Sequence, residues 1–138
     1  MPDRADYASD ITLIDHLVAL KLVPDWGAIE ATDIDMVGFA TATTGTDTIL
    51  LDYTNNTGFT LLIYDWSAGI WTGDGQLYGA LFNVSLSTLF GSLGGARGFA
   101  EVFSKPKRIE NGQRFQVIAR QDTGSNQDLL CSVGMCHI

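Results

Sequence analysis

The chain has 138 residues, of which 46% are hydrophobic and only 17% are charged, and its formal net charge is −8. One domain of this length buries enough surface to fold without a disulfide or metal staple. The negative charge argues against a protein that wraps nucleic acid, which requires a basic face. With two histidines and two cysteines, the sequence offers few catalytic side chains, so we expect a non-enzymatic protein without a cofactor.

The first element expected along the chain is an amphipathic helix that ends before a proline. Ile11, Ile14 and Val18 recur at helical spacing, which places them on one apolar face. We therefore expect residues 1–24 to form an N-terminal helical arm and residues 25–138 to form a β-sandwich domain. The apolar face of the helix can pack on its own domain or clasp a neighbouring subunit, and the sequence leaves both arrangements open.

Signals for membranes and secretion are not found. No run of eighteen apolar residues occurs, so we expect no transmembrane helix. The acidic start of the chain lacks an apolar stretch, so we expect no signal peptide. Asn55 and Asn83 each begin a glycosylation sequon, but without a signal peptide they are better interpreted as turn and strand residues.

Short apolar segments separated by Gly, Asn, Asp and Thr clusters follow the helix at intervals of about ten residues, which is typical of a sandwich or barrel. The cluster at residues 54–58 predicts a hairpin turn. Residues 67–69 are expected to bend the chain. Strands are expected at residues 36–43, 48–53, 59–66, 77–86, 99–103, 113–120 and 129–135.

Two segments are expected to be loops. Residues 87–98 are rich in glycine and predict a loop or a broken short helix; they lack the Gly-Lys-Ser/Thr ending of a phosphate-binding loop. Residues 104–112 predict a basic loop that contains Lys105, Lys107 and Arg108. These three side chains are candidates for contacts with an acidic partner surface.

Charge is divided unequally along the chain. Residues 1–75 hold twelve acids and two bases, whereas residues 76–138 hold four acids and six bases. Opposite charge on the two halves permits head-to-tail association of subunits. Alternatively, strands from both halves interleave in the fold and the asymmetry averages out.

Two groups of side chains invite a chemical interpretation. Cys131, Cys136 and His137 lie close together in sequence, but on one strand they point in alternating directions, so two core cysteines are favoured over a metal site or a disulfide. Aromatic residues could form a sugar-stacking platform, although strand aromatics more often serve as core or interface anchors. These aromatic residues are Trp26, Tyr64, Trp66, Trp71 and Tyr78.

One stretch carries a resemblance to a known family. Residues 106–113, followed by the alternating Phe115, Val117 and Ala119, are similar to the penultimate-strand region of single jelly-roll virion proteins. The resemblance implies an all-β fold, a jelly-roll-like antiparallel β-sandwich with a short N-terminal helix. It also implies a capsid or other virion component, for example of a bacteriophage, assembled in the host cytoplasm. The family carries no catalytic residues to transfer.

Three functions follow from these observations. The first is a viral structural protein that self-assembles through lateral subunit contacts and binds other virion proteins, with no catalytic or metal site. Its interface candidates are Ile11, Ile14, Val18, Lys105, Lys107 and Arg108. The second is a carbohydrate- or receptor-binding β-sandwich module. The third, least favoured, is a small hydrolase that depends on His16 or His137.

Overall fold

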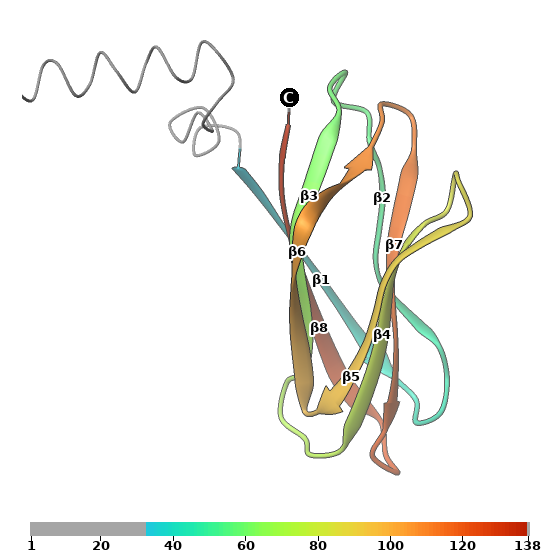
Figure 1. The fold of residues 1–138 in the computed structure, drawn as a ribbon. Helices are drawn as coiled ribbons and strands as arrows, with labels where there is room; N and C mark the ends of the chain where they lie inside the picture. Colours follow the sequence, from blue (N-terminus) through green and yellow to red (C-terminus); the bar gives the residue numbers. More distant parts are fainter. Residues whose placement is uncertain (1–32, 138) are drawn as a thin grey trace, which may run out of the picture. The chain divides into compact units, whose positions relative to one another are not determined.

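The computed structural model describes residues 33–137, which form two four-stranded antiparallel sheets packed face to face (Figure 1). Sheet A has the strand order β1-β8-β3-β6, and sheet B has the order β2-β7-β4-β5. The strands are β1 (Asp33–Ala42), β2 (Thr48–Thr54), β3 (Leu61–Ile70), β4 (Gln76–Asn83), β5 (Thr88–Ala96), β6 (Gly98–Ile109), β7 (Arg114–Asp122) and β8 (Gln127–His137).

This strand order is that of a jelly roll, in which strands far apart in sequence lie side by side. The expected all-β sandwich is therefore confirmed. The expected N-terminal helix, and the domain boundary at residues 24 and 25, lie outside the described residues. Strands from residues 1–75 and 76–138 alternate in sheet A, whereas in sheet B only β2 comes from the first half and lies beside β7 of the second. Acids of the first half therefore lie next to bases of the second within one subunit.

The core lies between the sheets and is built from alternate residues of the inner strands. Phe115, Val117 and Ala119 of β7 are at most 2% exposed, which confirms the inward face predicted from their alternation. From sheet A, Trp66 is buried against them in the same core cluster. Its indole Nε1 donates a 2.8 Å hydrogen bond to a carboxylate oxygen of Glu101 on β6, so this buried polar atom is satisfied.

The glycine-rich segment, expected to be a loop, forms strand β5 instead. Its glycines make room for neighbouring groups. A Cβ on Gly91 would lie 2.4 Å from Oε1 of Glu101, and a Cβ on Gly95 would lie 2.4 Å from the carbonyl oxygen of Gly98. The glycines therefore signal close packing within a strand rather than a connection. The bend expected at residues 67–69 is also wrong, because β3 continues to Ile70.

The basic segment, also expected to be a loop, belongs largely to β6, which runs to Ile109 at one edge of sheet A. The pairing of β3 with β6 shifts abruptly, from Ile63 opposite Lys107 to Asp65 opposite Val102. Residues 103–106 therefore bulge out of the ladder. A bulge that contains a proline prevents an edge strand from pairing with another strand.

The turn between β2 and β3 was correctly expected, but it does not form a hairpin. Its Gly58 has a φ of +81°, while β2 pairs with β7 and β3 pairs with β6 and β8. The turn thus carries the chain from sheet B to sheet A. Two-residue hairpin signals report the turn geometry, not the identity of the paired strands.

Buried Asn55 holds this turn in place. Its Nδ2 donates to the carbonyl oxygens of Phe59, at 2.8 Å, and Ile109, at 3.0 Å. Its Oδ1 accepts hydrogen bonds from the backbone N–H and the hydroxyl of Thr57. Asn83 is likewise fully buried, so both sequon asparagines are structural residues in turns or strands, as expected.

Candidate interaction surfaces

The outer face of sheet A exposes large apolar side chains. Val37 and Phe39 on β1 are 68% and 58% exposed, and Val102 on β6 is 79% exposed. Trp71, directly after β3, is 64% exposed, and its backbone N–H donates to the carbonyl oxygen of Asp128 on β8. These four residues, which we call the apolar face, lie on a folded domain without a covering element among residues 33–137.

A hollow of about 440 Å³ opens on this same face. Small residues of three adjacent strands, Ser132, Ser67 and Ala100, face one another in register and contribute to its lining. The apolar walls include Val37 and Val102. The hollow therefore lies where the sheet carries short side chains between longer ones.

Two carboxylates also line this hollow. Asp35 of β1 and Asp65 of β3 both lie opposite Gly134 of β8. Asp65 Oδ1 accepts the backbone N–H of Gly134 at 3.0 Å, and a Cβ on Gly134 would lie 2.3 Å from that oxygen. The carboxylate of Asp65 therefore leans over Gly134. Neither Asp35 nor Asp65 forms an ion pair with another described residue.

The outer face of sheet B, in contrast, pairs its charges across strands. Arg120 of β7 donates through Nε to Asp47, at 2.8 Å. Arg114 of β7 forms an ion pair with Asp52 of β2, and Gln116 also donates to Asp52, at 3.1 Å. The hydrogen bond from Arg114 is the main cause of a lowered pKa of Asp52. Each pair joins an acid from the first half of the chain to a base from the second.

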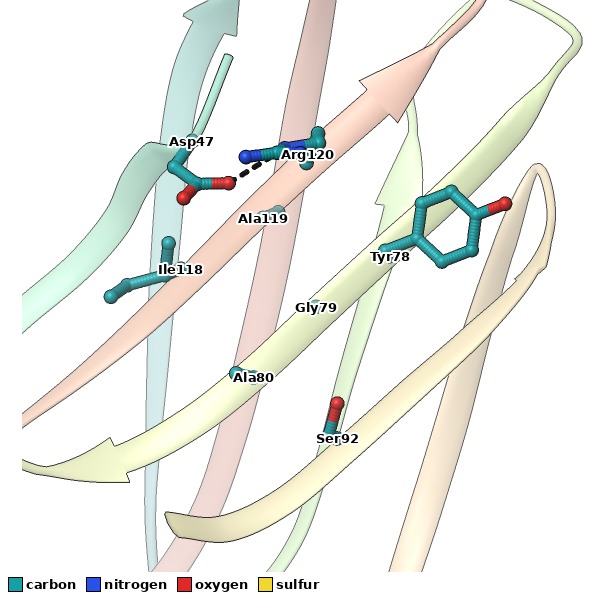
Figure 2. Close-up of a pocket in the computed structure, with 8 residues that line it drawn as sticks. All are labelled: Asp47, Tyr78, Gly79, Ala80, Ser92, Ile118, Ala119 and Arg120. Carbon is teal, nitrogen blue, oxygen red and sulfur yellow. Dashed lines mark hydrogen bonds and ion pairs between the residues drawn. The ribbon is translucent and has the colours of Figure 1, made fainter. Parts of the chain in front are cut away.

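A second hollow, of about 450 Å³, lies on sheet B. Figure 2 shows the ion pair of Asp47 and Arg120 near one end, with Tyr78 on β4 and Ser92 on β5. Ala80 is a further small residue of its lining. An aromatic ring, a hydroxyl and a charged pair around a shallow hollow are groups that can contact a polar ligand.

The three basic interface candidates differ in their surroundings. Lys107 Nζ lies 5.3 Å from the ring centroid of Phe103, a cation–π contact. Arg108 forms a 3.0 Å ion pair with Glu110. Lys105 is exposed on the bulge and forms no ion pair with another residue of the described range. Lys107 and Arg108 therefore interact with side chains of their own subunit.

The cysteines and the C-terminal histidine are not brought together as a metal site; in residues 33–137, no three His, Cys, Asp or Glu side chains are placed to hold a metal ion. Cys131 and Cys136 are buried and not disulfide-bonded. Burial raises the pKa of Cys131 to about 11, so its thiol is a poor nucleophile. The ring of His137 stacks on Phe59, with 4.6 Å between centroids.

The predicted aromatic platform is divided among separate sites. Trp66 belongs to the core, Trp71 to the apolar face and Tyr78 to the hollow on sheet B. Trp26 and His16 lie outside the described residues, as do Ile11, Ile14 and Val18. No helix long and apolar enough to cross a membrane is found in the described part of the chain.

Sequence reasoning did not find the apolar face or its two carboxylates. A signal was present in β1, where Met36, Val37 and Phe39 put apolar side chains on both faces of one strand. An edge strand with one solvent-facing side usually alternates between apolar and polar residues. The departure from alternation marks an outer face that differs from ordinary surface.

Comparisons with known proteins give fold-level similarity only. No family model matches the sequence, and no match is found among curated proteins. Among solved structures, a chain from Bacillus endospore appendages, described as disulfide-linked pili, is 13% identical, with 78% of this chain and 89% of that chain covered and a TM-score of 0.45.

Two viral structures are also similar. A chain from the capsid of Helicobacter pylori bacteriophage KHP30 is 8% identical, with 75% of this chain and 90% of that chain covered and a TM-score of 0.43. The infectious bursal disease virus VP2 subviral particle is 7% identical, with 76% and 32% covered and a TM-score of 0.44. At these values, the function has to be argued from the surface of the chain itself.

Proposed function

We propose that this chain is a non-enzymatic structural subunit that self-assembles through lateral contacts, as a capsid or other virion component. The observation that carries the proposal is the apolar face of sheet A. Val37, Phe39, Trp71 and Val102 are all more than half exposed on one side of the sandwich. Large apolar side chains exposed on one face of a sheet favour a protein–protein contact, because their hydration is unfavourable until a partner covers them.

The contact residues we propose come from two segments. The basic residues of β6, Lys105, Lys107 and Arg108, lie at one edge of sheet A. The apolar positions Ile11, Ile14 and Val18 precede the sandwich in sequence and would cover a neighbour's apolar surface. Copies of the same chain are the main partner, with other virion proteins beside them; no nucleic acid is required.

The test is the native mass of the purified protein over a range of protein and salt concentrations, with negative-stain imaging of large species. We expect rings or shells that loosen as salt rises, since exposed charge contacts are screened. Removal of residues 1–23 should lower the mass of the assembly. A monomer at every concentration, by native mass and by imaging, would contradict the proposal.

A second candidate function, carbohydrate or receptor binding, is favoured by the hollow on sheet B. Tyr78 is 48% exposed there, and an aromatic ring can stack on the apolar face of a sugar while Asp47, Arg120 and Ser92 hydrogen-bond its hydroxyls. A glycan panel screened by calorimetry tests it. Binding that disappears in Tyr78→Ala but persists in Phe59→Ala, a half-exposed aromatic outside the hollow, would support this function.

A further inference from the structure

We infer that the hollow on the outer face of sheet A receives the basic β6 bulge of a second copy of this chain, with Lys105 as the inserted side chain. This inference rests on the proposed function, self-assembly, and names the two surfaces that meet. The acceptor is the hollow lined by Asp35, Asp65, Val37 and Val102. The donor is the bulge at residues 103–106.

The acceptor has the chemistry that a lysine side chain needs. Asp35 of β1 and Asp65 of β3 lie opposite the same residue of β8, Gly134, and both line the hollow. The valines of the hollow can cover the aliphatic stem of a lysine, and the carboxylates can hold its ammonium group. A volume of about 440 Å³ accommodates such a side chain.

The donor is an exposed basic side chain that forms no ion pair with another described residue. Lys107 and Arg108 are held by Phe103 and Glu110 of their own chain. Lys105 makes no ion pair with the described residues, including the carboxylates of its own hollow. The following Pro106 lacks an N–H, so the bulge meets a neighbour through side chains rather than through added strand pairing.

Charge also selects between two ways of covering the apolar face. If two copies packed this face against itself, Asp35 and Asp65 would approach the same carboxylates of the partner, and like charges would repel. Insertion of the bulge instead brings opposite charges together. A single insertion leaves the acceptor of one copy and the donor of the other free, and further insertions at these patches extend the contact to a ring or a filament.

The experiment uses the full chain and two charge reversals. Asp35→Lys removes the acceptor and keeps Lys105, whereas Lys105→Glu removes the donor and keeps the hollow. We expect each variant alone to associate at least tenfold more weakly than the unmodified protein, by sedimentation velocity. Mixed together, the two should associate again, because Lys105 of the first variant meets the intact hollow of the second.

A matched control is Asp122→Lys, which makes the same charge change at an exposed β7 position outside the hollow. It should assemble like the unmodified protein. Circular dichroism and melting of all variants establish that they are folded. If the unmodified protein assembles and both reversals assemble equally well, the inference is wrong while the proposed function stands.

Two other outcomes also overturn it. Assembly that is lost only when residues 1–23 are removed, and not in either reversal, would show that the contact depends on the N-terminal segment and not on Asp35 and Lys105. A mixture of the reversals that remains monomeric would show that the two patches do not meet. A chain that is monomeric before any substitution would contradict the proposed function itself.

Discussion

The two outer faces of the sandwich are both formed by alternate residues of their strands, yet they differ in how their charged side chains are paired and in the apolar side chains that they expose. On sheet B, Asp47 and Asp52 are each paired with an arginine of β7. On sheet A, Asp35 and Asp65 form no ion pair with another described residue. The exposed side chains Val37 and Val102 line the same hollow.

The difference shows where a partner has the most to contribute. A face whose charges are paired within the subunit gains little from a further charged contact, since exposed pairs are already weak and solvated. A face with unpaired carboxylates and exposed apolar groups gains both hydrophobic burial and ion pairing when it is covered.

The largest effect is expected at Asn55, because this residue supports both sheets. Its amide bonds the β2–β3 turn to the end of β6. Asn55→Ala leaves buried carbonyl and N–H groups without partners, which costs roughly 3 kcal/mol of unfolding free energy. Urea denaturation measures it. The exposed neighbour Asn56→Ala should change stability little; equal effects of the two substitutions would contradict the role of the buried amide.

The substitution Phe39→Ser tests whether the outer face of sheet A, rather than that of sheet B, forms the contact between subunits. The side chain is 58% exposed, so its loss should leave stability nearly unchanged. Association should weaken by roughly 2 kcal/mol, or about thirtyfold, if Phe39 is covered at the contact. The control is Leu89→Ser on sheet B, where the side chain is 56% exposed. Equal loss of association in both variants, measured by sedimentation, would remove the distinction between the faces.

The rate at which Cys131 is alkylated tests whether the layer between the two sheets excludes solvent. The pKa of this thiol is raised by burial to about 11, so the folded state disfavours the thiolate. Its contribution to stability is complete below the unfolded pKa of about 8.5 and is lost as pH rises through the folded value. We expect iodoacetamide to label Cys131 slowly at pH 8 in the native protein and rapidly in urea. Rapid native labelling would show that the layer opens.

The smallest effect is expected for the charge pair of Asp52 and Arg114. The pKa of Asp52 is lowered, so the pair stabilises the fold above the unfolded pKa of about 3.9 and this contribution disappears as pH falls through the lower folded value. Asp52→Asn should therefore reduce the melting temperature slightly at pH 7 and by less at pH 2.5. Assembly should be unaffected; a change in assembled mass would place a contact on sheet B.

The sequence predicted the parts of the fold that local pattern determines. Phe115, Val117 and Ala119 alternate with polar residues, and this pattern correctly assigned both the strand and its buried side. The glycines of β5 misled the prediction because their role depends on groups distant in sequence: Gly91 faces Glu101, and Gly94 faces the ring of Tyr78. Local propensity carries no information about such contacts.

Of the two surfaces that we propose to meet, only the donor was predicted from the sequence. Lys105 was singled out from its charge, although in a segment taken to be a loop. Asp35 and Asp65 could not be joined from the sequence, because they meet across β8, whose residues come about seventy positions later than Asp65. The hollow is a property of strand register, which alternation within single strands does not specify.

The pairing of β1 with β8 has a consequence for synthesis in the cell. Asp33 pairs with Cys136, so a nascent chain cannot complete sheet A until nearly all of the sandwich has left the ribosome. Contacts so distant in sequence slow folding and leave unpaired strands exposed meanwhile. A subunit of this topology therefore delays the completion of its assembly surface: a partly synthesised chain cannot yet present the hollow that lies across β1, β8 and β3.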